Sequence, residues 1–483
     1  MNDLRSQAGS MMPRRDFLRT LGTTAAGLAL SSRGVLGAAA AEEGKGRGKG
    51  IATVRGAFLY PSTASLKKAG YYSWPGAGFD AEGHHREYAS RIARIARKLN
   101  MDISMDAKPL HDAASVTRFI NGVKQQPPDG LLFIPFKKSD WESIVRIVKE
   151  VGIPTVILAT MGILLNPRIN QLHRKPGVYL ICSLDNFDAL ENGMRMIRAA
   201  RWMKENRIIS LAGSASRVTT VSKLGTEVRA LPRERFAEEF NRTETTEIVR
   251  NIARRYLKNA RGRVEPSEAD VIDAAKSYVV CKRILHAENG DAIMMDCLGG
   301  ISDRQFPPPC MGFMSLRDEG IAAGCQNDLN ATLTMMLVQY LFDRPGFQQN
   351  ASSETEKNHY YGAHCTCASR LNGTTEPPEP YILRNHAESG WGVAPQVLWR
   401  IGQDVTMAHV LAGETPRMII YSGKVVGRYN TPPAGGCRTN VELTINEVPD
   451  VCDVKGMHQT IFYGNYARQL RAFCQLFGIA VET

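Results

Sequence analysis

The segment AAGCQNDLNATLTM, residues 322–335, joins a polar turn to the start of an apolar helix. Turns of this kind often carry catalytic or metal-binding side chains, because a rigid element fixes the loop in place. The first long polar side chain is an amide, Gln326, which carries no charge and accepts no proton at working pH. Asp328, two residues later, is the nearest carboxylate that could serve as a base or a ligand. The segment therefore has the build of a functional turn from which a charge is missing.

A second group of chemically active residues lies in the segment AHCTC. Cys365 and Cys367 are two positions apart, so they would project on the same side of a strand, next to His364. These groups could bind a metal, but a structural zinc site needs four ligands, and no second pair of cysteines has the spacing to supply them. Most other cysteines lie in apolar segments and are expected to be buried free thiols.

Four segments carry a resemblance to a known family: CQNDLNATLTMMLVQYL, RPGFQQN, YGAHCTC and MHQTIFYGNYARQLRAFCQLFGIAV. Together with the order of the predicted domains along the chain, these segments resemble the L-fucose isomerase and L-arabinose isomerase superfamily. The resemblance is specific over residues 309–483 and a matter of pattern over residues 51–300. It implies an enzyme that interconverts aldoses and ketoses at a Mn²⁺ site and forms homo-oligomers with active sites between subunits.

The resemblance assigns roles to individual residues. Gln326 and Gln349 fall where the family has metal-binding carboxylates, and His458 falls at a further metal-ligand position. His364 and His458 match family histidines and are expected to contact the sugar. Isomerisation through an ene-diol needs a base and anionic oxygen ligands for the metal, so two amides should weaken or abolish both functions. Asp328 is the candidate replacement.

Two classes of function remain open. The first is a sugar isomerase-like enzyme whose activity is altered or lost. The second is an exported sugar-binding protein without catalysis, because residues 129–160 and the segment LDNFDALENGMRMI resemble periplasmic sugar-binding proteins. Both classes imply a small sugar or polyol as partner. Trp74, with His84 and His85, could form an aromatic lip, since aromatic rings stack on the apolar faces of sugars. An ordinary aromatic loop is the alternative.

Rigid elements must hold these residues in place. From residue 51, near-continuous apolar runs alternate with amphipathic segments, which predicts parallel sheets covered by helices on both faces. We expect two Rossmann-like α/β domains over residues 51–169 and 170–345, with the strand VYLICSLDN in the second. Short alternating segments separated by Gly, Pro and Asn then predict an antiparallel β-barrel-like domain over residues 346–483.

The N-terminal leader predicts export. Residues 1–41 contain RRDFLRTLG, a weakly apolar stretch and a small-residue cleavage region, the pattern of a twin-arginine signal peptide rather than a membrane-spanning helix. Residues 42–50 have the composition of a flexible linker. We therefore expect a periplasmic or otherwise exported protein without stable membrane insertion.

The positive charge of the chain does not indicate nucleic acid as a partner. The net charge is +12, and the eight Lys/Arg and four Asp/Glu of residues 1–50 account for +4 of it. The rest is spread over the remaining chain without a basic run that is interleaved with aromatic residues.

Overall fold

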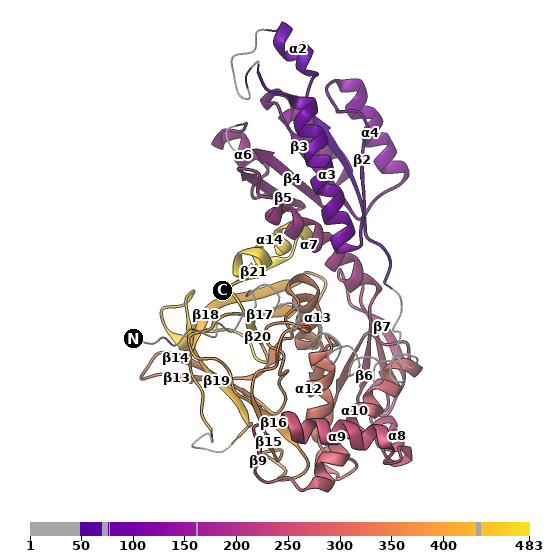
Figure 1. Ribbon diagram of the computed structural model, residues 1–483, viewed down its shortest axis with the longest axis vertical. Helices are drawn as coiled ribbons and strands as arrows, with labels where there is room; N and C mark the ends of the chain where they lie inside the picture. Colours follow the sequence, from indigo (N-terminus) through magenta and orange to yellow (C-terminus); the bar gives the residue numbers. More distant parts are fainter. Residues whose placement is uncertain (1–48, 70–75, 77, 161–162, 431–435) are drawn as a thin grey trace, which may run out of the picture. The chain divides into compact units, whose positions relative to one another are not determined.

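The computed structural model describes residues 49–69, 76, 78–160, 163–430 and 436–483. The signal peptide, the linker up to residue 48 and Trp74 lie outside the described residues, so the expectations for them stay predictions. The described chain is a mixed α/β protein with parallel strands before residue 346 and a curled antiparallel sheet after it (Figure 1). This arrangement is compatible with the expected α/β domains followed by a barrel-like domain. None of the described helices is long and apolar enough to span a membrane.

The first sheet is parallel throughout, with the strand order β2-β1-β3-β4-β5. The central strands β3 and β4 are buried along nearly their whole length because helices cover both faces, whereas the edge strand β2 is partly exposed. The strand bounds are β1 (Thr53–Leu59), β2 (Asp102–Met105), β3 (Gly130–Pro135), β4 (Thr155–Thr160) and β5 (Val178–Ser183). The segment VYLICSLDN, expected in the second α/β domain, forms β5 and pairs with β4 instead. An apolar run shows that a strand is buried, but does not show which sheet contains it.

Two pairs of helices cover this sheet. Helices α3 (Ala81–Leu99) and α7 (Phe187–Glu205) pack on one face, and helices α4 (Ala113–Gln125) and α5 (Trp141–Val151) pack on the other. Side chains alternate along β1, so that Phe58 packs against α3 and α7, and Leu59 packs in the core formed with α4 and α5. The shorter helices of this region are α2 (Thr63–Lys68), η1 (Lys138–Asp140) and α6 (Asn166–Leu172).

The second sheet has the order β11-β10-β6-β8-β7 and is parallel except for the edge strand β7. Its strands are β6 (Arg207–Leu211), β7 (Arg217–Thr220), β8 (Glu227–Leu231), β10 (Ala292–Met295) and β11 (Ala323–Cys325). Its helices are α8 (Glu234–Arg242), α9 (Glu247–Asn259), α10 (Glu268–Ala287), α11 (Cys297–Ser302), α12 (Cys310–Asp318) and α13 (Leu329–Phe342). Strands β7 and β8 were not expected, because charged and exposed residues interrupt their apolar pattern.

The antiparallel sheet has the order β12-β20-β17-β18-β19-β14-β13, with β21 beside β18. Its strands are β12 (Phe347–Gln348), β13 (Asn350–Glu354), β14 (His359–His364), β17 (Asp404–Leu411), β18 (Arg417–Gly427), β19 (Thr439–Ile445), β20 (Thr460–Tyr463) and β21 (Ala480–Glu482). Strands β12 and β13 are the two edge strands of this sheet, on opposite sides of it. In the chain, however, only Gln349 separates them. The sheet therefore curls back on itself at Gln349. The η2 turn (Val451–Asp453) and helix α14 (Ala467–Phe477) complete this region.

A small three-stranded sheet, β16-β15-β9, links the second α/β region to the C-terminal region. Strand β9 (Gly262–Arg263) pairs with β15 (Tyr381–Arg384), which pairs with β16 (Ala394–Val397). Directly after β9, the Glu265 carboxylate accepts hydrogen bonds from Nε and Nη2 of Arg384, the latter at 2.7 Å. These bonds lower the pKa of Glu265 below its usual value, although partial burial opposes the shift.

This ion pair predicts a pH-dependent contribution to stability. A carboxylate with a lowered folded-state pKa stabilises the fold above its unfolded pKa of about 4.3 and loses that effect as the pH falls through the folded value. We expect wild type to exceed Glu265→Gln in free energy of unfolding at pH 7, and the gap to close below about pH 4. Urea unfolding of both proteins from pH 7 downward measures it. A gap that stays constant with pH would contradict the assignment.

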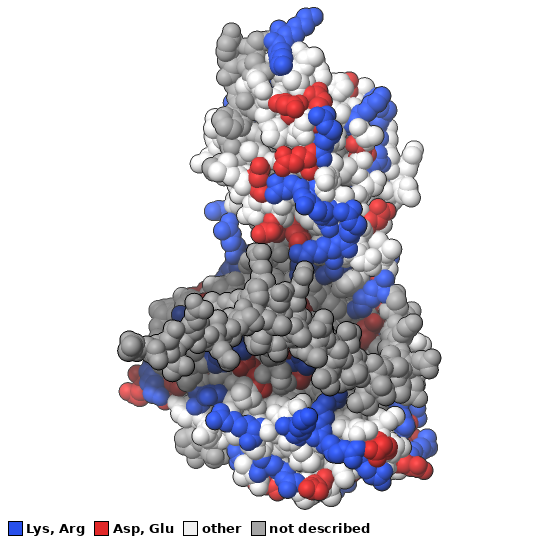
Figure 2. Space-filling view, in the orientation of Figure 1, with Lys and Arg blue, Asp and Glu red and all other residues white. Residues whose placement is uncertain are grey.

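Basic and acidic side chains are interspersed on the described part of the face that Figure 2 shows. Ion pairs elsewhere among the described residues include Lys98 with Glu191 and Arg146 with Glu150, both at 2.8 Å. Exclusion of nucleic acid as a partner remains a prediction from the sequence.

Candidate functional site

The turn after β11 has an unusual backbone conformation. Gln326 and Asn327 have φ values of 54° and 52°, in the left-handed region that residues other than glycine seldom adopt. Asp328 follows as the N-cap of α13, where its Oδ1 accepts a hydrogen bond from the backbone N–H of Ala331 at 2.8 Å. The sequence predicted both the turn and the helix. Two consecutive left-handed residues are typical of positions where function requires a particular arrangement.

Asp328 is bound to His458, which comes from the segment before β20. Nδ1 of His458 lies 2.8 Å from the second carboxylate oxygen of Asp328. Nε2 of the same ring lies 2.9 Å from the side-chain oxygen of Asn350, at the start of β13. His458 also has a left-handed backbone, with a φ of 58°. Three distant segments thus form one polar group, Asp328–His458–Asn350, which we call the Asp–His–Asn group.

The Asp328 carboxylate is fully engaged. Burial favours its neutral form, but hydrogen bonds from His458 and from the Ala331 N–H outweigh burial and hold the pKa of Asp328 below its usual value. One oxygen caps a helix and the other binds His458. Asp328 therefore serves to position His458, which argues against its expected role as a free base or a replacement metal ligand.

Gln349 does not face this group. Its side chain is fully buried inside the curled sheet, where Nε2 donates to Tyr360 Oη at 2.6 Å and to the Gln459 carbonyl at 3.3 Å. Successive side chains of extended chain point to opposite sides, so the next residue, Asn350, contacts His458 instead. Gln349 therefore does not converge with His458, contrary to the expectation, and Asn350 lies there in its place.

Mn²⁺ does not fit the residues present. The expected ligand positions hold the amides Gln326 and Gln349 together with His458, whose two ring nitrogens already face Asp328 and Asn350. A hard divalent cation prefers anionic oxygens, and the only carboxylate of the Asp–His–Asn group is already committed. The family resemblance implies carboxylates at two positions where this sequence has amides. Asp328 therefore does not replace them.

His364 lies at the end of β14 and is 1 % exposed. Its ring packs edge-on against His458, with ring centroids 5.5 Å apart. Burial, with a further contribution from nearby Arg317, lowers the pKa of His364 to about 3, so that the ring is neutral. Such burial does not suit the direct sugar contact expected for His364, and its neighbours are His458 and a thiol instead.

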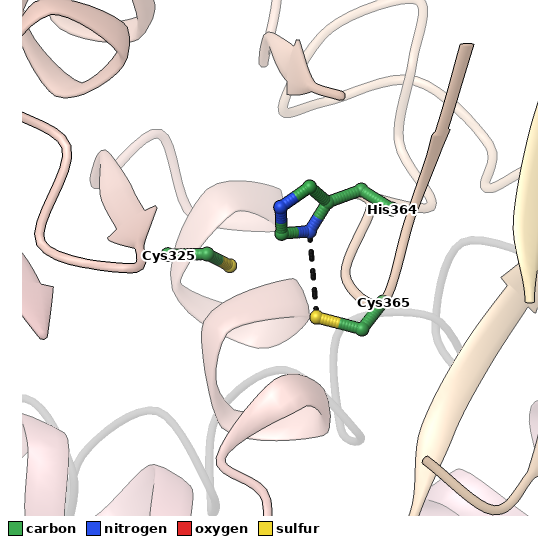
Figure 3. A group of neighbouring side chains, drawn as sticks. All are labelled: Cys325, His364 and Cys365. Atoms are coloured by element: carbon green, nitrogen blue, oxygen red, sulfur yellow. Dashed lines mark hydrogen bonds between the residues drawn. The ribbon is translucent and has the colours of Figure 1, made fainter. Parts of the chain in front are cut away.

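That thiol is Cys365, whose Sγ lies 3.3 Å from Nδ1 of His364. Cys325, at the end of β11, completes a buried cluster with these two residues (Figure 3). Cys367, expected to pair with Cys365, packs in a different core. Both cysteines follow the last residue of β14, so the side-to-side alternation of a strand no longer applies to them. Most of the ten cysteines are buried and all are free, as expected.

Three residues of the site were not predicted from the sequence: Asn350, Gln348 and Arg317. Gln348 holds Cys325 by accepting from its N–H at 3.0 Å and donating to its carbonyl at 3.1 Å. Arg317 is buried, and its Nη2 lies 3.7 Å from the sulfur of Cys325. Only the run of amides after Phe347 hinted at a role for Gln348 and Asn350. Arg317 looked like an ordinary helix residue.

The two histidines of the expected aromatic lip lie on helix α3. His85 stacks on Phe58 with ring centroids 3.9 Å apart, and His84 stacks on Phe79 at 4.6 Å. Tyr60 lies 2.8 Å from Nδ1 of His85 and follows the carboxyl end of β1. Ligands of open parallel sheets bind at such ends, so a binding role for this cluster stays a prediction.

The chain matches no family model and no curated protein. The resemblance to sugar isomerases therefore stays a prediction that rests on the quoted segments.

Proposed function

We propose that this protein binds a small sugar or polyol at the Asp–His–Asn group, on an isomerase-like scaffold that does not carry out Mn²⁺-dependent isomerisation. The observation that carries the proposal is the convergence of Asp328, His458 and Asn350 from three separate segments. Sugar hydroxyls both donate and accept hydrogen bonds, so without a metal they can use the amide N–H groups of Asn350 and the remaining lone pairs of the Asp328 and Asn350 oxygens, or exchange with the bonds inside the group.

Left-handed backbone at Gln326, Asn327 and His458 supports this function. Such strain persists only where the surrounding structure enforces it, and it concentrates at ligand sites. A cavity of about 380 Å³ adjoins the same turn and is lined by Ser210, Met294, Asn327 and residues of the β7–β8 hairpin. Asn327 and Ser210 hydrogen-bond at its wall, 2.8 Å apart. The cavity reaches the turn at Asn327, next to Asp328 in the chain, whereas Asp328, His458 and Asn350 themselves do not line it.

The remaining expectations form part of the same proposal. Residues 51–345 would form two Rossmann-like domains, with β5 in the first, and residues 346–483 a barrel-like domain. Export through the twin-arginine pathway would place the folded protein in the periplasm. A homo-oligomer with sites between subunits would bring the aromatic cluster of one subunit to the site of another. Cell fractionation and analytical ultracentrifugation test export and assembly separately.

Calorimetric titration with aldoses, the matching ketoses and polyols tests the binding function. We expect wild type to bind at least one of them, and His458→Asn to weaken that affinity by about 10-fold or more, because one good hydrogen bond is worth about 1.5 kcal/mol. Asparagine tolerates the left-handed backbone of position 458. His173→Asn, at an exposed histidine, is the matched control.

Two outcomes would contradict the proposal. Failure of wild type to bind any sugar or polyol would remove the function altogether. Conversion of an aldose into its ketose by wild type in the presence of Mn²⁺ would favour the catalytic isomerase over the binding protein.

A further inference from the structure

Cys325, His364 and Cys365 form a compact group of soft ligands outside the Asp–His–Asn group. One donor atom from each residue lies within 4.8 Å of the other two, and all three residues are buried. Figure 3 shows their side chains pointing toward one another from the end of β11 and the end of β14. Gln348 fixes the backbone of Cys325 through two hydrogen bonds, so this ligand position is rigid.

The imidazole of this group is incompletely satisfied. Nδ1 of His364 lies 3.3 Å from the Cys365 sulfur. In the part of the chain that the structure describes, Nε2 of the same ring is buried and has no hydrogen-bond partner. A buried polar atom without a partner is costly, and native folds seldom keep one without a reason. A neutral ring in this position can use either nitrogen to bind a metal.

Arg317 adds a buried positive charge next to the thiols. Among the described residues, its guanidinium donates to the carbonyls of Ala323 and Thr366 and approaches the sulfur of Cys325 at 3.7 Å. These partners are neutral, whereas a buried cation is stable only with a compensating negative charge. Thiolates are the groups in contact with it that could supply that charge.

We propose that Cys325, Cys365 and His364 bind a thiophilic metal ion, monovalent copper in the first place. Thiolates select copper(I) and zinc, whereas Mn²⁺ prefers oxygen ligands. On binding, both thiols release their protons to solvent and form metal–sulfur bonds, and His364 contributes one nitrogen. Two thiolates and Cu⁺ carry a net charge of −1, which the Arg317 guanidinium balances.

Zinc fits the same group less well. Zn²⁺ with two thiolates is neutral and leaves Arg317 unbalanced, and structural zinc sites have four ligands. Cys310, whose thiol interacts with that of Cys365, is the candidate fourth ligand and would bring the charge to −1, but it lies outside the group whose donor atoms are all within 4.8 Å of one another. A zinc site would therefore depend on Cys310, whereas the copper site would not. This proposal uses none of the three residues of the Asp–His–Asn group, although the His364 ring packs against that of His458.

Metal titration of the full-length protein tests the proposal. Reduced, metal-free protein is titrated anaerobically with Cu⁺ against a chromogenic copper(I) chelator, and separately with Zn²⁺ and Mn²⁺. We expect one equivalent of Cu⁺ and no retained Mn²⁺. Cys325→Ser and Cys365→Ser should each weaken Cu⁺ binding by at least about 100-fold, because a soft ligand is lost. Cys367→Ser is the matched control and should bind as wild type does.

His364→Gln keeps the proposal testable if a serine variant fails to fold, since it leaves both thiols in place. It should retain Cu⁺ with about 10-fold or greater loss of affinity, and circular dichroism confirms its fold. Equal Cu⁺ binding by wild type, Cys325→Ser and Cys365→Ser would overturn the proposal, as would a Cys325–Cys365 disulfide in the native protein. Preferential Zn²⁺ binding that Cys310→Ser abolishes would overturn the assignment to monovalent copper.

Discussion

Replacing Gln326 by glutamate and Asn350 by aspartate should raise the affinity of the protein for Mn²⁺. Each carboxylate adds about 8 kcal/mol of attraction to a divalent ion at about 4 Å and an effective dielectric of 20, before the cost of desolvation. Even with most of this attraction lost to desolvation, we expect an affinity gain of at least about 100-fold, or about 2.7 kcal/mol. Calorimetric titration of wild type and the double variant with Mn²⁺ measures it.

The control uses the neighbouring amide of the same strand segment. Gln326→Glu with Gln349→Asp adds the same charges, but position 349 lies inside the curled sheet among Tyr360 and Gln459. This variant should gain much less Mn²⁺ affinity and should lose stability, because it buries a carboxylate in place of a bonded amide. Equal gains by the two double variants would contradict the placement of Asn350 at the site. Micromolar binding by the native protein would contradict the missing-charge interpretation.

Gln348→Met should destabilise the fold strongly. The Gln348 side chain is fully buried and pairs with both the N–H and the carbonyl of Cys325, along the free edge of β11. Methionine has a similar size but leaves both backbone groups unpaired, at roughly 1–3 kcal/mol for each group. We expect a loss of about 2–5 kcal/mol in the free energy of unfolding, measured as a lower urea midpoint.

An exposed glutamine provides the comparison for this variant. Gln125→Met, at the end of α4, changes the same side chain on the surface and should shift stability by less than about 0.5 kcal/mol. Gln348→Glu should be at least as harmful as Gln348→Met, because it buries a charge and sets a carboxylate against the Cys325 carbonyl. A small effect of Gln348→Met would mean that water replaces the amide at the edge of β11.

Local patterns in the sequence predicted most individual elements. The apolar run VYLICSLDN forms the strand β5, and the short alternating segments expected after residue 346 form the strands of the curled sheet. Periodicity encodes whether a segment buries one face or two, which is a local property. It does not encode the partner, and for this reason β5 was placed in the wrong sheet.

The sequence by itself also determined the chemistry of the turn after β11. The residue types give a neutral amide at Gln326 and a carboxylate at Asp328, and no fold can turn that amide into a carboxylate. Only the tertiary structure decided that Asn350, and not Gln349, meets His458, because the side of the chain that faces His458 depends on how the curled sheet is closed. Only the tertiary structure brought Cys325 to Cys365 beside a buried arginine. Such contacts join segments that are distant in the chain, and their geometry depends on how whole sheets pack rather than on any local pattern.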